Sequence, residues 1–249
     1  MIDLENVGNK AFGKSLNSAY LNNEVKIPLP PIDIQKQIVS ECEKVDEEYN
    51  KSRMTIEEYK KKVAETMANV KGEMERLRDI APYATTRIAF ADTQTENYIT
   101  TDNLLQNCEG IKPYDSIPNI DSVTKYTTND ILVSNIRPYL KKIWFSDRDG
   151  GCSPDVLVFR PKSEINARFV YYSMKQDIFF DYMMQGNKGV KMPRGDKNNI
   201  PNFQIPVPPL DEQQRIVSEI ESYEQKISEA KAIMDGCSER KKKILEKYL

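Results

Sequence analysis

The chain has 249 residues, 39% of them hydrophobic, and its 36 Lys and Arg residues nearly balance 38 Asp and Glu residues. This length and composition allow a sizeable core in about one to three structural units. Histidine is absent, which excludes His-based catalytic triads and His metal sites, and the four cysteines lack the spacing of a zinc site.

The sequence shows no segment for membrane insertion or secretion. No apolar run approaches the roughly 20 residues of a membrane span. Residues 1–5 lack the basic start and apolar stretch of a signal peptide. A cytoplasmic location without a membrane partner is therefore expected.

Residues 1–26 are mixed in character and contain several Gly and Asn residues. They precede a stretch that occurs twice, over residues 27–41 and 205–219. The register of this repeat extends back to a Gly-Asn-Lys triplet at 8–10 and again at 186–188. Residues 1–26 are therefore predicted to be a stub that resembles the end of a preceding module.

Both copies of the repeat carry alternating prolines, then an aspartate, a glutamine and the run Ile-Val-Ser-Glu. Proline fixes φ and keeps its predecessor out of the α region, so the prolines predict an extended backbone. Asp33 and Asp211 follow, and each is predicted to be the N-cap of a helix. Two copies are too few for a solenoid, so they indicate a module, used twice, that ends in a proline hinge and enters a helix.

Residues 27–80 are predicted to form the first proline hinge and one long helix over 34–80. A seven-residue apolar repeat sustained over this length is typical of a coiled coil. The residues that carry the repeat are Cys42, Tyr49, Ile56, Val63, Val70 and Leu77.

A β-rich globular domain is predicted over residues 81–209. Strand composition occurs at 98–101, 122–126, 131–133, 142–145 and 155–159. Turn signals lie at 129–130, 147–151 and 186–195. Apolar residues at four-residue spacing predict one helix over 169–184.

Residues 210–249 are predicted to form the second long helix, with two apolar seams of its own. The first helix leads into the globular domain and the second returns from it, so the two are expected to pair antiparallel. The basic run at 240–243 suits the negative end of the helix dipole better than a DNA-binding tail. The predicted fold class is α+β, with one β-rich globular domain between two long helices that form an antiparallel coiled coil.

Sequence motifs for nucleotide-dependent catalysis, such as the P-loop, are missing. Two basic stretches of the globular domain stand out, at 134–142 and 186–199. Lys and Arg neutralise phosphate, and Arg, Asn and Ser can hydrogen-bond base edges, although a solvated loop explains each stretch equally well. The candidate DNA-binding residues are Ser134, Asn135, Arg137, Tyr139, Lys141, Lys142, Lys188, Lys191, Arg194 and Lys197.

Three stretches, 129–138, 188–195 and 205–213, closely resemble the specificity subunit of type I restriction–modification systems. The resemblance implies a sequence-specific reader of double-stranded DNA with no catalytic site and no cofactor of its own. It implies a modification (methyltransferase) subunit and a restriction (endonuclease) subunit as partners, which would bring S-adenosylmethionine, ATP and magnesium. The full-length subunit of that family has two recognition domains, whereas this sequence has one complete domain. One domain reads one half-site, so reading a bipartite site is expected to require a homodimer.

Two other functions stay open at this stage. One is a stand-alone DNA-processing enzyme, either a nuclease or a methyltransferase. The other is a coiled-coil scaffold whose globular head binds protein.

Overall fold

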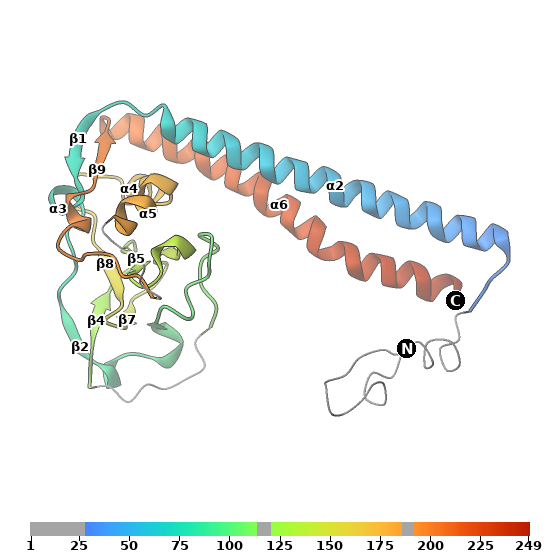
Figure 1. Cartoon of the computed structure of the whole chain (residues 1–249), viewed down its shortest axis with the longest axis horizontal. Helices are drawn as coiled ribbons and strands as arrows, with labels where there is room; N and C mark the ends of the chain where they lie inside the picture. The colour runs from blue at the N-terminus through green and yellow to red at the C-terminus, as the bar shows by residue number, and fades with distance from the viewer. Residues whose placement is uncertain (1–27, 114–120, 186–191) are drawn as a thin grey trace. The chain divides into compact units, whose positions relative to one another are not determined.

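The computed structural model describes residues 28–113, 121–185 and 192–249 (Figure 1). Two long helices, α2 (Ile32–Ala68) and α6 (Leu210–Tyr248), flank a globular region. The chain divides into two compact units. The hairpin unit contains the described residues up to 56 together with 228–249, and the domain unit contains residues 57–227. Within the described residues, every helix is too short or too polar to cross a membrane.

In the hairpin unit, α2 and α6 pack antiparallel, as predicted. Val45 and Cys237 are buried at the seam, and the Cys237 thiol contacts the Val45 carbonyl oxygen at 3.8 Å. Ion pairs flank this seam, including Lys241 Nζ to Asp46 Oδ1 at 2.5 Å. Burial of the apolar residues stabilises the pairing, whereas exposed ion pairs of this kind contribute little because solvent screens them.

The other ends of the same helices pair in the domain unit. The rings of Tyr59 on α2 and Tyr223 on α6 lie 5.6 Å apart, centroid to centroid. Val63 packs against the core to which Ile216 and Ile220 of α6 belong. The antiparallel coiled coil predicted from the seven-residue repeat is therefore present in both units.

The helix predicted over 34–80 ends earlier, at Ala68. The next residues turn back and form strand β1 (Glu73–Arg76), which pairs antiparallel with β9 (Gln204–Val207) just before α6 (Figure 1). At Gly72 a Cβ atom would lie 2.3 Å from the backbone of Val207, so only glycine allows the two segments to approach this closely. The apolar repeat continues past this point, but pairing with β9 overrides it.

The starts of the two helices also differ from the prediction. α2 begins at Ile32 and α6 at Leu210, so Asp33 and Asp211 lie inside the first helical turn and are not the N-caps. A carboxylate in the first turn still interacts favourably with the positive end of the helix dipole.

The repeated glutamine makes the same contact in both copies of the repeat. Gln35 Nε2 donates to the Pro30 carbonyl oxygen at 2.8 Å, and Gln213 Nε2 donates to the Pro208 carbonyl oxygen at 2.8 Å. Each side chain thus ties the proline hinge to the first turn of its helix. In the second copy the buried Gln213 also accepts from the Asn166 backbone N–H at 2.9 Å, which joins the hinge to the globular region.

The strands of the described domain form three sheets. The central one has the order β6 (Ile143–Phe145), β5 (Ile131–Ser134), β8 (Val156–Phe159) and is antiparallel. Every residue of β5 and β8 is buried, because both faces of this sheet are covered. The continuous apolar composition of both strands is typical of such a position.

One face of the central sheet packs on two helices and the start of α6 (Figure 1). These helices are α4 (Ala167–Met174) and α5 (Asp177–Met184), where one helix was predicted over 169–184. The break lets Phe169 and Phe179 enter the same core from two directions. At the break, Lys175 turns its ammonium group to Glu224 of α6 at 2.6 Å.

The other face of the central sheet packs on a four-stranded sheet with the order β2-β4-β7-β3. Leu132 and Trp144 of the central sheet meet Tyr126 and Cys152 in this second core. The strands of the four-stranded sheet are β2 (Arg87–Ala89), β4 (Ser122–Tyr126), β7 (Gly150–Cys152) and β3 (Tyr98–Ile99).

Strand β7 corrects the turn predicted over 147–151. A Cβ at Gly150 would lie 2.3 Å from the Asn97 carbonyl oxygen and 2.5 Å from the Tyr126 hydroxyl oxygen. The glycine allows close packing inside a sheet at this position.

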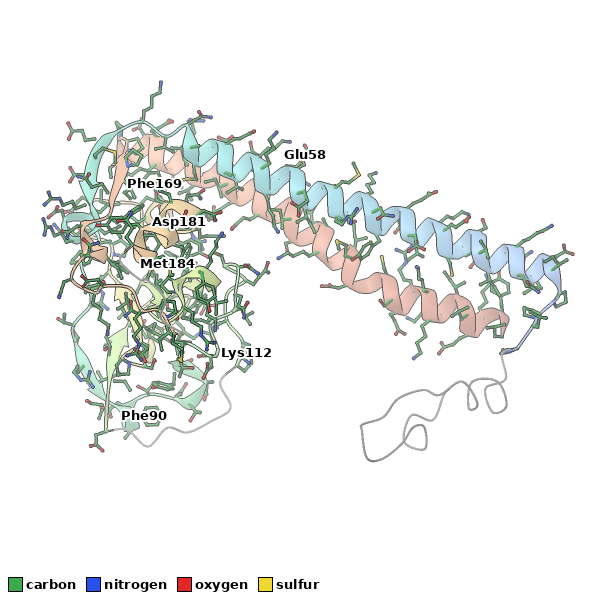
Figure 2. All side chains as sticks on the ribbon, viewed as in Figure 1. Glu58, Phe90, Lys112, Phe169, Asp181 and Met184 are labelled. Atoms are coloured by element: carbon green, nitrogen blue, oxygen red, sulfur yellow. The ribbon has the colours of Figure 1, made fainter. Side chains whose placement is uncertain are left out.

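Short connections complete the domain: α3 (Leu77–Ile80) and the 3-10 turns η1 (Phe90–Asp92), η2 (Thr95–Asn97), η3 (Pro138–Leu140) and η4 (Ile200–Asn202). Phe90 and Phe169 lie at opposite ends of the globular domain (Figure 2).

Candidate nucleic-acid interface

The segment that follows β5 is fixed from inside the protein. Ser134 and Asn135, both predicted to contact DNA, are only 2% exposed. The Ser134 hydroxyl donates to the Ile136 carbonyl oxygen at 2.9 Å. The Asn135 backbone N–H donates to the Asp155 carbonyl oxygen at 2.8 Å, and its own carbonyl oxygen accepts from Gly195 N–H at 3.2 Å. In the structure the Ser134 hydroxyl and the Asn135 backbone therefore fix the loop, and both side chains are buried beneath its surface.

The loop continues through η3, which is flanked by two residues in the left-handed region. Arg137 has φ 51° and ψ 62°, and Lys141 has φ 50° and ψ 52°. Non-glycine residues adopt these angles only where the surroundings impose them, at a cost of about 1–3 kcal/mol each. Here the Arg137 N–H donates to the Pro193 carbonyl oxygen and the Cys108 N–H donates to the Lys141 carbonyl oxygen, both at 2.8 Å. The loop is thus held in one strained conformation.

The structure brings the second basic stretch to the same place, as far as it is described. Ile136 and Arg194 form an antiparallel bridge between the two stretches. We call residues 134–142 together with 192–197 the loop cluster. Lys188 and Lys191 lie outside the described residues.

The cations of the loop cluster are engaged to different degrees. Lys141 Nζ pairs with Asp177 Oδ1 at 2.6 Å, and Arg194 Nη2 pairs with Asp155 Oδ2 at 3.2 Å. Carboxylates therefore neutralise two of the predicted DNA contacts in the free protein.

The remaining side chains of the loop cluster differ in their contacts and in their exposure to solvent. Lys142 Nζ donates to the Thr101 carbonyl oxygen at 2.5 Å, and burial lowers the pKa of this lysine. The Nε of Arg137 is buried and has no partner among the described residues. Tyr139, the middle residue of η3, is the one aromatic residue of the loop cluster, and 50% of its surface is exposed.

An open groove of about 550 Å³ lies beside the loop cluster and shares Lys197 with it. Its wall also carries Arg78 and Arg87, which were not among the predicted site residues. Arg87 has uncharged neighbours, and Arg78 lies in a stretch of mixed charge with Glu75, Arg76 and Asp79, so neither belongs to a basic run. Only the pairing of distant segments brings them to Lys197.

The described residues contain no group of three or more Cys, Asp and Glu side chains placed to hold a metal ion. Burial raises the pKa of the Cys108 thiol to about 11 and that of Cys152 to about 12. A thiol acts as a nucleophile as its thiolate, so both cysteines are inert near neutral pH.

The model of the family described as "type I restriction modification DNA specificity domain" matches residues 69–234, which is well over half of the chain. The chain belongs to this family. The match confirms the resemblance stated from residues 129–138, 188–195 and 205–213. It spans the globular domain with the loop cluster and the groove, as well as a large part of α6.

Similar proteins agree with this assignment. The specificity subunit of the type I restriction enzyme EcoDI from Escherichia coli is 31% identical over 97 residues, which make up 39% of this chain and 21% of that protein. The HsdS subunit from Thermoanaerobacter tengcongensis has the same fold with a TM-score of 0.54 and 17% identity, over 89% of this chain and 59% of its own. The type I S subunit from M. genitalium reaches a TM-score of 0.61 at 14% identity, over 95% of this chain and 66% of its own. This specificity domain therefore spans only part of the length of the proteins it matches.

Proposed function

We propose that this chain reads one half-site of a double-stranded DNA target and directs a type I restriction–modification complex to it. The observation that best supports this proposal is the extent of the family match, which covers residues 69–234 and so includes the globular domain with its loop cluster. The stand-alone enzyme and the protein-binding scaffold have no comparable support.

In this proposal the loop cluster approaches the DNA as a preformed surface. The Ser134 hydroxyl and the Asn135 backbone hold the loop in place, while exposed Tyr139, Arg194 and Lys197 face the ligand. Lysines contact mainly phosphate, whereas an arginine can also bind the edge of guanine through two hydrogen bonds. A loop that is already rigid loses less conformational entropy on binding, which favours discrimination between sequences.

We propose that catalysis belongs to partner subunits. A modification subunit would bind the paired helices α2 and α6 and supply S-adenosylmethionine chemistry. A restriction subunit would supply the chemistry that requires ATP and magnesium. The high pKa values of Cys108 and Cys152 support a non-catalytic role for these thiols in this chain.

A bipartite site requires two recognition domains, and we propose that a second copy of the chain supplies the other one. Val39 and Val217 occupy the same position of the repeat. Val217 is 1% exposed and belongs to the core of the domain unit, whereas Val39 of the hairpin unit is 54% exposed. The start of α2 therefore exposes a valine at the position where α6 packs against its recognition domain, and we propose that a second copy buries it.

The dimer is tested by light scattering at micromolar concentration, with and without a modification subunit. We expect a dimer whose symmetry is matched by a symmetric, interrupted DNA site. Val39→Asp should shift it toward monomer. A wild-type chain that stays monomeric under both conditions would refute this part of the proposal.

DNA reading is tested by incubating the chain with random duplexes and sequencing the bound pool. Enrichment of a short motif without cleavage is expected. Cleaved or methylated duplexes would favour the enzyme, and an unenriched pool would favour the scaffold. Arg194→Ala should weaken binding and blur one position of the motif at a cost of about 1–3 kcal/mol. Lys61→Ala, on the exposed face of α2, is the control.

A further inference from the structure

The groove beside the loop cluster lies where the edges of two sheets meet. Residues 82–84 run along the outer edge of β8, with the Ala84 N–H donating to the Val158 carbonyl oxygen at 2.9 Å. Arg87 of β2 and Thr124 of β4 form the opposite wall. The apolar part of the lining comes from Ala84, Pro154, Val156, Leu157, Val158 and Pro201.

Three cations line this groove, and none of the described residues that line it is a carboxylate. Arg87 Nη2 donates to the Ser122 carbonyl oxygen at 2.7 Å, and Lys197 Nζ donates to the Pro154 carbonyl oxygen at 2.8 Å. These neutral acceptors orient the two side chains without cancelling their charge. Arg78 is exposed on α3. Within the described ranges, none of the three cations forms an ion pair, in contrast to Lys141 and Arg194 of the loop cluster.

The groove and the loop cluster are continuous. Pro154 and Lys197 line the groove, while Asp155, next to Pro154 in the sequence, pairs with Arg194 of the loop cluster. A strand of DNA whose bases meet the loop cluster therefore has an uncancelled positive surface beside it. The groove is open along one side and far larger than a single phosphate group, so a chain of linked sugar–phosphate units fits it better than an isolated anion.

We propose that this groove seats the sugar–phosphate backbone of the bound DNA strand, with Arg78, Arg87 and Lys197 on the phosphates and the apolar wall against the deoxyribose. The inference rests on the proposed DNA-reading function and assigns it a backbone-positioning surface that adjoins the loop cluster and shares Lys197 with it. Backbone contacts set register and affinity but carry no sequence information themselves. The groove therefore contributes equally to the affinity for every duplex that the domain binds.

The test measures duplex affinity against salt concentration for the double variant Arg78→Gln/Arg87→Gln. These two residues lie outside the loop cluster and are exposed, so the fold should be retained. Each phosphate contact contributes about 0.9 to the slope of log K against log salt. The double variant should therefore lower the slope by about 1.8 and weaken binding roughly 60-fold at 0.1 M salt, for target and scrambled duplexes alike.

Lys162→Ala is the matched control, because Lys162 is an exposed lysine of the same domain that does not line the groove. The single variant Arg87→Lys should keep most of the wild-type slope of log K against log salt, because it retains the positive charge. The thermal melt of each variant confirms that it is folded. If the double variant keeps the slope of the control while wild type still selects its target, the groove assignment is wrong and the DNA-reading function stands. If only the target duplex is weakened, the groove reads bases and the backbone assignment is also wrong. If wild type binds no duplex, both proposals fail.

Discussion

Two aspartates form ion pairs with candidate DNA-binding residues in the free protein, and replacing these aspartates should tighten DNA binding. Asp177 pairs with Lys141 and Asp155 pairs with Arg194, at 2.6 and 3.2 Å. If these cations contact phosphate, each must exchange a carboxylate for the DNA. Asp155→Asn and Asp177→Asn remove that competition and also remove a negative charge that repels the backbone.

The size of the effect follows from the exposure of the pairs. The side chains of Arg194 and Asp155 are 58% and 35% exposed, and those of Lys141 and Asp177 are 32% and 75% exposed. Ion pairs this open are worth at most about 1 kcal/mol, which corresponds to roughly a fivefold change in affinity. Each substitution should therefore tighten duplex binding by up to about fivefold, and both together by up to about 25-fold, because the two pairs share no partner.

Fluorescence anisotropy with a labelled duplex at fixed salt measures the change, and urea unfolding measures stability alongside. Asp147→Asn is the matched control, because Asp147 pairs at 2.5 Å with the adjacent Arg148, which lies outside the loop cluster. It reports the general effect of removing one negative charge from the domain. If Asp155→Asn and Asp177→Asn bind no more tightly than this control, the two ion pairs are purely structural and Lys141 and Arg194 do not contact DNA.

Three further outcomes test the fold. Ile56 is 7% exposed at the α2–α6 seam, so Ile56→Asp should cost several kcal/mol and lower both helicity and the urea midpoint; an unchanged midpoint would contradict the seam. Asp130 is 2% exposed and accepts two hydrogen bonds from Arg160. Arg160→Gln should lower the free energy of unfolding in urea by about 3 kcal/mol, the lower end of the cost of breaking a buried ion pair, because Arg160 is partly exposed. A loss below about 1 kcal/mol would argue against a buried pair. A hydrogen bond from Arg240 lowers the pKa of Glu48 from its ordinary value of 4.5. The stabilisation of the folded state by this carboxylate is therefore complete above pH 4.5 and is lost as the pH falls through the lower folded-state pKa. Thermal melts should show acid destabilisation that Glu48→Gln reduces, and an identical acid response in that variant would count against the pair.

Local composition was enough to predict the long helices and most central strands. Apolar residues recur every seven positions in α2, and β5 and β8 are short continuous apolar runs. Such patterns indicate which residues become buried on folding, and their burial stabilises these elements in any compact fold. The repeat around the two proline hinges was likewise visible, and the structure adds the glutamine contacts to Pro30 and Pro208.

Contacts between distant segments decided the rest. The apolar repeat extends through Leu77, yet α2 ends at Ala68 because β1 finds its partner in β9. Gly150 resembles a turn residue, but its missing Cβ makes room for Tyr126 inside a sheet. In each case the local pattern was compatible with two structures, and a partner far away in the sequence selected one.

The candidate site divides in the same way. Basic residues clustered in the sequence marked the loop cluster, and the bridge between Ile136 and Arg194 brings its two stretches together. Their composition could not show that Asn135 is buried or that Arg194 is neutralised by Asp155, because burial and pairing depend on the surrounding fold. Charge is a property of the sequence, but whether that charge is free to meet a phosphate is set by the side chains that the tertiary structure places beside it.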